Sequence, residues 1–157
     1  MDQTIADLTP AEINWLAQQQ QAATNFVITA TARDLDGPVT LADLDLAFKM
    51  WITKQPTDAD EIDGVINAVG VVFGRYLVDG AGLKWVVATD QHGSELAVYG
   101  LPGAGDVLIC PANFVAKRWE RRETDFLEKT YAQMSAHIRS VAMDHAGRTA
   151  RPWWRFW

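Results

Sequence analysis

The chain of 157 residues contains one cysteine, Cys110, and three histidines. A single cysteine excludes an internal disulfide and any metal site built from several thiolates. Cys110 ends the apolar run Val107-Leu108-Ile109-Cys110, so we expect a buried, small apolar side chain there. The composition therefore predicts no metal site and no bound cofactor.

The sequence also lacks long apolar runs. No stretch reaches the ~20 apolar residues that a helix needs to span a bilayer. The first ten residues, MDQTIADLTP, have neither the basic start nor the apolar centre of a signal peptide. We therefore expect a cytoplasmic protein.

Signatures of catalysis are missing as well. The chain has no Gly-x-Ser-x-Gly elbow, no P-loop, no dinucleotide fingerprint and no EF-hand loop. Cys110 has no candidate base near it in the sequence. No residue is therefore predicted to be catalytic, and the balance is against an enzyme.

What the chain does have is an uneven distribution of charge. The net charge is −6, but residues 1–63 carry −8 and residues 64–157 carry +2. Nucleic-acid binding depends on neutralising phosphates with Lys and Arg, so an acidic chain of this kind is not expected to bind nucleic acid. An acidic face can attract a basic protein partner.

The pattern of apolar residues predicts an α+β fold. We expect three N-terminal helices, a three-stranded antiparallel β-meander and a C-terminal helix packed on one face of the sheet. Residues 1–144 form a single domain in this prediction, and residues 145–157 form a C-terminal tail. The expected helices cover about residues 10–32, 41–54, 59–78 and 124–144, and the expected strands cover 83–89, 94–99 and 106–110.

The ends of these elements have recognisable signals. Thr9 with Glu12, Thr40 and Asp58 are expected to cap the three N-terminal helices. The third helix has the broadest apolar stripe, so it should lie at the centre of the core. Its two glycines, Gly70 and Gly74, should permit a neighbouring element to approach closely.

One segment resembles a known family. Val69-Gly70-Val71-Val72-Phe73-Gly74, Leu83-Lys84-Trp85-Val86-Val87 and Thr89-Asp90-Gln91-His92-Gly93 are followed by Pro111 and Val115-Ala116-Lys117-Arg118-Trp119-Glu120-Arg121. This combination resembles the bacterial domain of unknown function DUF3806, over about residues 61–138. The resemblance implies no particular activity. The glycine that usually follows the Lys-Arg-x-Glu segment of the family is replaced here by Arg122.

Two charged segments are candidate binding sites. Asp90, His92 and Glu95 surround the first hairpin, where they could form an acid/base or metal site; the alternative is that Asp90 and His92-Gly93 only shape the turn. Lys117, Arg118, Glu120 and Arg121 belong to the densest charge cluster, which could bind an anion or an acidic partner. The alternative there is a solvated segment whose charges pair with the acidic N-terminal half.

The tail is the third candidate. Residues 145–157 contain three arginines, three tryptophans and one phenylalanine, with no acid. The tail could fold back on its own domain, bind another protein or touch a membrane surface, the last being the weakest of the three. The residues that would make these contacts are Arg151, Trp153, Trp154, Arg155 and Trp157.

These observations predict a non-catalytic protein-interaction domain, of a regulatory or immunity type, whose partner is another protein. Self-association into a homo-oligomer is a further prediction. The alternative function is a small enzyme or ligand-binding domain that uses the Asp90–Glu95 hairpin and the Lys117–Arg118 segment.

Overall fold

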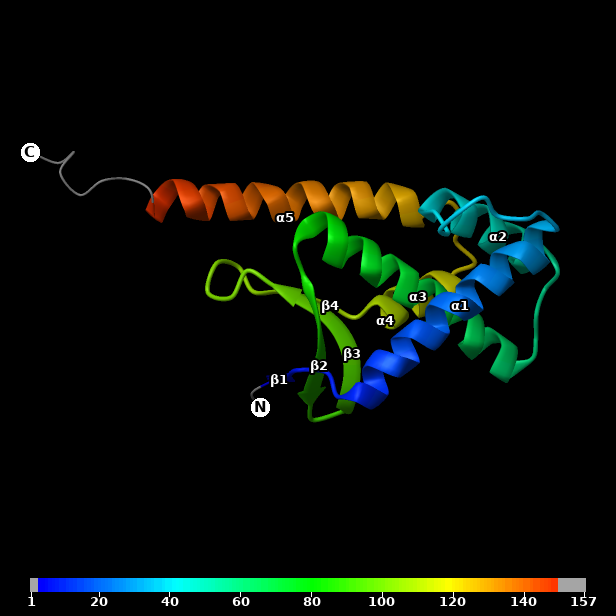
Figure 1. Cartoon of the computed structure of the whole chain (residues 1–157), viewed down its shortest axis with the longest axis horizontal. Coiled ribbons are helices and arrows are strands. Elements are labelled where there is room, and N and C mark those ends of the chain that lie inside the picture. Colours follow the sequence, from blue (N-terminus) through cyan, green and yellow to red (C-terminus); the bar gives the residue numbers. More distant parts are fainter. Residues whose placement is uncertain (1–2, 150–157) are drawn as a thin grey trace, which may run out of the picture.

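The computed structural model describes residues 3–149, which form an α+β fold of four strands and five helices (Figure 1). The predicted fold class is confirmed. In chain order the elements are β1 (Thr4–Ala6), α1 (Pro10–Thr31), α2 (Leu41–Thr53), α3 (Ala59–Ala81), β2 (Lys84–Asp90), β3 (Gly93–Gly100), β4 (Val107–Ile109), α4 (Pro111–Glu120) and α5 (Leu127–Thr149).

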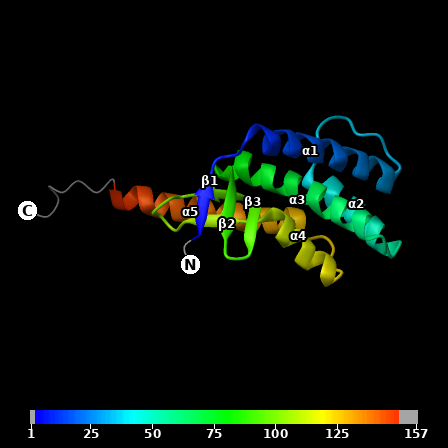
Figure 2. The ribbon, with the colours of Figure 1, turned by 90° about the horizontal axis from the view of Figure 1, so that it is seen from below.

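The strands form one antiparallel sheet in the order β1-β2-β3-β4. The predicted meander is confirmed in β2, β3 and β4, and Figure 2 shows β1, β2 and β3 side by side. The prediction of three strands is wrong, because Thr4–Ala6 adds a fourth at the free edge of β2. Three residues are too few to display an alternating pattern, so this strand left no signal in the sequence.

The starts of α1, α2 and α3 are those predicted from capping residues. The backbone N–H of Thr9 donates to the Glu12 carboxylate at 2.6 Å, and Asp58 accepts from the backbone N–H of Glu61 at 2.8 Å. Thr40 and Asp43 form a reciprocal capping box at the start of α2. These bonds satisfy backbone groups that a helix leaves without an internal partner.

The segment after the sheet forms more helix than predicted. The predicted layout has no helix between the third strand and the C-terminal helix, but α4 spans Pro111–Glu120. Pro111, directly after the third predicted strand, occupies the first position of this helix. Proline suits that position because its missing N–H would have no helical partner there.

Helix α3 lies at the centre of the core, as predicted. Phe73, Leu77 and Val69 on it are fully buried, and α1, α4 and α5 all pack against it. The prediction that the C-terminal helix lies on the sheet is wrong: α5 packs mainly along α3 and α2, while α3 and α4 contact the sheet. No helix in residues 3–149 is long and apolar enough to cross a membrane.

The start of α5 is anchored by a residue from α2. The buried carboxylate of Asp45 accepts the backbone N–H of Leu127 at 2.9 Å and that of Glu128 at 3.0 Å. We expected the helix to begin near Thr124 or Asp125 and to end near residue 144, but it spans Leu127–Thr149. A cap supplied from 82 residues away cannot be recognised in the local sequence.

The two glycines of α3 permit close approach, as predicted. A Cβ on Gly70 would lie 2.9 Å from the backbone N and Cα of Ala112 in α4. A Cβ on Gly74 would overlap the ring of Trp85 and lie 2.9 Å from Pro111. This side of α3 therefore has no room for even one methyl group.

Candidate binding groove

The first hairpin behaves as a turn. Asp90 Oδ1 accepts a hydrogen bond from the backbone N–H of His92 at 2.7 Å. Asp90 therefore shapes the turn, which was the alternative to an acid/base or metal site. His92 is exposed, with its Nε2 3.1 Å from the side-chain nitrogen of Gln91. Within residues 3–149 no group of three His, Cys, Asp or Glu side chains is arranged to hold a metal ion.

Glu95 links the hairpin to α4. Its carboxylate accepts a hydrogen bond from the side chain of Asn113 and interacts with the thiol of Cys110. Asp90 and Lys117 also act on this thiol through their charges. The structure therefore brings three predicted site residues, Asp90, Glu95 and Lys117, to the surroundings of one half-buried cysteine.

The surroundings of Cys110 suppress its reactivity. Burial raises the pKa of the thiol to about 11, and the hydrogen bond and negative charge of Glu95 add to the rise. The nearby charge of Lys117 lowers the pKa but does not outweigh these effects. Since the thiolate is the nucleophile, Cys110 is held in its inert form at neutral pH.

The cluster at the end of α4 is paired within itself. Arg118 Nε lies 3.0 Å from Glu123, and Arg121 lies 3.6 Å from the same carboxylate. The Arg122 guanidinium lies 3.7 Å from the centre of the Trp119 ring and donates to the Trp119 carbonyl oxygen at 2.7 Å. The alternative of pairing with the acidic N-terminal half is wrong for these arginines, because Arg118 and Arg121 pair with Glu123 and Arg122 contacts Trp119.

Arg122 occupies an unusual backbone position. Its φ of 56° is in the left-handed region that favours glycine. The resemblance predicted a glycine here, and Arg122 adopts a conformation that glycine favours. The stacking of Arg122 on Trp119 offsets part of the conformational cost.

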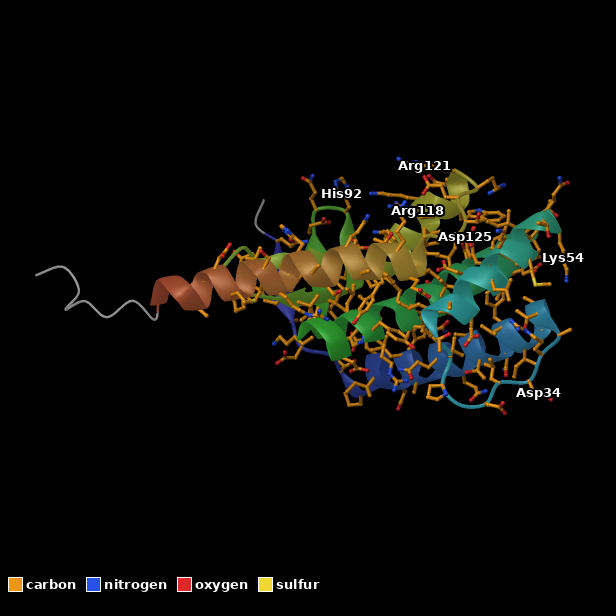
Figure 3. The ribbon with its side chains drawn as sticks, turned by 90° about the horizontal axis from the view of Figure 1, so that it is seen from above. Asp34, Lys54, His92, Arg118, Arg121 and Asp125 are labelled. Atoms are coloured by element: carbon orange, nitrogen blue, oxygen red, sulfur yellow. The ribbon has the colours of Figure 1, made fainter. Side chains whose placement is uncertain are left out.

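The structure also has a groove away from these predicted sites. A groove of about 830 Å³ is lined by residues of α1, the second half of α3, β2 and α5, together with Pro38 and Val39. Figure 3 shows α3 between α1 and α5, while His92, Arg118 and Arg121 lie on the opposite side of the molecule from Asp34. The residues that line the groove are Ile13, Leu16, Ala17, Gln20, Gln21, Thr24, Pro38, Val39, Val72, Arg75, Tyr76, Asp79, Gly80, Trp85 and Tyr131.

The floor of the groove is apolar, and its exposed lining mixes apolar and polar side chains. Leu16, Val39 and Val72 are buried, whereas Ile13 at the rim is 55% exposed. An exposed isoleucine beside a concave apolar surface leaves area that a bound molecule could cover.

The polar groups of the groove are arranged around Arg75. Its guanidinium donates to the side-chain oxygen of Gln20 at 2.7 Å and lies 3.5 Å from Asp79. Both charged side chains are at least half exposed. The Tyr76 hydroxyl donates to the Val39 carbonyl oxygen at 3.0 Å, and burial raises the pKa of this phenol.

The sequence held one signal for this groove that we did not use. Gln20 interrupts the apolar stripe of the first helix, between Leu16 and Ala23. In the structure, the side chain of Gln20 accepts a hydrogen bond from Arg75 and so links α1 to α3. Two smaller hollows, of about 510 and 300 Å³, lie beside the start of α5.

The tail was the third predicted site. Arg151, Trp153, Trp154, Arg155 and Trp157 lie outside the described residues. The single-domain division into residues 1–144 and a tail therefore stays a prediction.

Comparison with known proteins identifies the family but no activity. Residues 46–131 match the model of DUF3806, a domain of unknown function. No curated protein matches the chain. A crystal structure of a protein from Bacteroides thetaiotaomicron VPI-5482 is similar, with a TM-score of 0.63 and 12% identity over 87% of this chain. Our chain covers 48% of that protein, so it spans about half its length, and the similarity shows the fold alone.

Proposed function

The chain belongs to the DUF3806 family, and we propose that it is a non-catalytic protein-interaction domain that binds a peptide segment in the groove between α1, α3 and α5. The observation that carries this proposal is the groove itself. It combines an apolar floor with an exposed lining that includes Ile13, glutamines and one ion pair. Binding sites of this composition gain affinity from the floor and specificity from a few polar groups.

The residues around the groove favour binding over catalysis. Its lining contains one carboxylate, one guanidinium and two phenols, and no histidine or cysteine. Burial raises the pKa of Tyr76, so this phenol loses its proton less readily than an ordinary tyrosine and is less suited to act as a general base. The groups present can orient and hold a segment, but they do not form a pair of acid and base with separated pKa values.

The alternative function, a small enzyme or ligand binder at the hairpin, has less support. The three cavities described above share only Arg118 with its predicted residues, and none is lined by Asp90, His92 or Glu95. The thiol nearest to that site is protonated at neutral pH. A ligand at the hairpin would have to bind on an exposed surface, which gives little burial.

The proposal is tested by selecting peptides from a random displayed library on the immobilised full chain. We expect selected peptides to lose binding to Ala17→Trp, because Ala17 is exposed and lines the groove, so the indole would fill it. The matched control is Gln18→Trp, which adds the same side chain to the neighbouring exposed position outside the groove.

Both variants should keep the melting temperature of the wild-type protein within a few degrees, which is measured alongside. Peptides that bind Ala17→Trp as well as they bind the wild type would contradict the proposal. A library that yields no binders at all would contradict it too.

A further inference from the structure

We propose that the segment bound in the groove is a basic amphipathic α-helix of about three turns, supplied by a partner protein. This inference rests on the proposed function, since it names the kind of segment that the groove receives. Three features of the groove support it: the spacing of the lining residues, the helical nature of the walls and the charge around Arg75.

The lining residues of α1 have the spacing of a helix–helix contact. Ile13, Ala17, Gln20 and Thr24 recur at intervals of four, three and four residues, so they form one ridge along the helix. When two helices pack, side chains of one fit between such ridges of the other. The ridge is about 17 Å long at 1.5 Å per residue, which is the length of about three turns of a second helix.

Helix α3 supplies a second ridge beside the first. Val72, Tyr76 and Asp79 recur at intervals of four and three residues and line the same groove. Figure 2 shows α1 and α3 side by side, and the two helices pack against each other. Two neighbouring ridges of this kind form the surface on which a third helix packs in a helical bundle. A helix with apolar residues at the same intervals would cover the apolar floor and the exposed side chain of Ile13 together.

The walls of the groove favour a helix over an extended segment. All but three of the lining residues belong to α1, α3 or α5, whose backbone groups are bonded within each helix. Two carbonyl groups of the lining already accept side-chain bonds, that of Val39 from Tyr76 and that of Gly80 from Arg139. An extended peptide would therefore bury its own N–H and C=O groups against walls without backbone partners, whereas a helix bonds these groups internally.

The charge around Arg75 favours a basic helix. The guanidinium of Arg75 donates to the side-chain oxygen of Gln20 at 2.7 Å and lies 3.5 Å from Asp79. The Asp79 carboxylate is 67% exposed, and the charge of Asp43 also acts on Tyr76 beside it. Two carboxylates therefore act on this end of the groove against one guanidinium. A Lys or Arg of the bound helix gains a charge-assisted bond with Asp79, whereas an acid there meets negative charge.

The test starts from the peptides that bind the groove in the displayed-library selection. We expect them to carry apolar residues at intervals of three and four, with Lys or Arg beside this stripe. Circular dichroism should show that they become helical when they bind the full chain. A proline in the middle of such a peptide should weaken binding about 100-fold, whereas a proline at its first helical position should change binding less than about twofold.

The charge is tested with Asp79→Asn. This variant should bind the basic peptides about 3–5-fold more weakly at low salt, which is the effect of a partly exposed ion pair. The matched control is Asp60→Asn, which makes the same change in net charge at an exposed position of α3 outside the groove. Replacing the Lys of a peptide with Glu should weaken its binding to the wild type more than its binding to Asp79→Asn.

Several results would overturn this inference. Selected peptides that tolerate the central proline, or that stay non-helical when bound, would show an extended segment in the groove. Acidic peptides that bind as tightly as basic ones would remove the role of Asp79.

Two further results would identify a different segment in the groove. Peptide binding that becomes tighter in the variant Trp153→Ser, Trp154→Ser, Phe156→Ser and Trp157→Ser would show that the tail of the chain fills its own groove. A wild-type dimer that Ala17→Trp converts to a monomer would show that a second copy fills it. In each of these cases the groove still receives a segment and the proposed function stands, whereas a library without binders would contradict both.

Discussion

The two sides of α3 contact their neighbours in opposite ways. On one side Gly70 and Gly74 bring the helix against α4 and β2 with no space for a methyl group. On the other side Arg75 and Asp79 project into a groove of about 830 Å³. The contrast shows that one helix can be tightly packed on one side and line a groove on the other, because residues three to four positions apart share a face.

The largest expected effect is on the tight side. Gly74→Ala should lower the free energy of unfolding by about 1–3 kcal/mol, because the new methyl would overlap Trp85 and overpacking outweighs the gain in helix propensity. Chemical denaturation measures it. Gly64→Ala on the same helix is the control, since its Cβ would meet nothing within 4 Å and should stabilise by up to about 1 kcal/mol. Equal effects of the two substitutions would show that α3 is not tightly packed at Gly74.

A second effect concerns Cys110, which precedes Pro111 on the tight side. With a pKa raised to about 11 from 9.0, its alkylation by iodoacetamide near pH 8 should be about 100-fold slower than that of an ordinary thiol. The raised pKa also means that the thiol's contribution to stability is present below about pH 9 and is lost as the pH rises toward 11.

Glu95→Gln should accelerate the alkylation, because it removes the carboxylate charge that opposes the thiolate. Lys117→Gln should slow it further, since the ammonium is the group that lowers the pKa. A Glu95→Gln variant with an unchanged rate would show that the carboxylate does not act on the thiol.

A smaller effect is expected on the groove side, where the nearest neighbour is the tip of a side chain. A Cβ on Gly80 would overlap the Tyr131 hydroxyl, but this ring faces the groove and can shift. Gly80→Ala should therefore change the free energy of unfolding by less than about 1 kcal/mol, because the gain in helix propensity offsets the displacement. In a Tyr131→Phe background the same substitution should become stabilising. A loss as large as that of Gly74→Ala would remove the distinction between the two sides.

The smallest effect is expected for the charged pair of the groove. Asp79→Asn should reduce stability by no more than about 0.5 kcal/mol, since the pair with Arg75 is exposed and four residues apart on a helix. Denaturation at low and high salt measures this loss, which should shrink as salt screens the pair. A loss above about 1.5 kcal/mol would mean that the pair supports the fold and is not available to a bound segment.

The candidate sites differ in how far they could be predicted. Dense charge at Lys117–Glu123 suggested a binding surface, but Glu123 and Trp119 engage Arg118, Arg121 and Arg122 within the cluster. The groove combines side chains from α1, α3, β2 and α5, and no segment of the sequence contains enough of them to suggest a site. Gln20 indicated the groove, because it is a polar residue within the apolar stripe of α1.

The sequence by itself determined the fold class, the capping of α1, α2 and α3 and the central position of α3. These features depend on contacts within a few residues or on a repeated apolar pattern, which the chain displays locally. Only the tertiary structure decided the fourth strand, the packing of α5 on α2 and α3, the cap from Asp45 and the position of the groove. Each of these joins residues distant in sequence, and their distances depend on how the helices pack around α3.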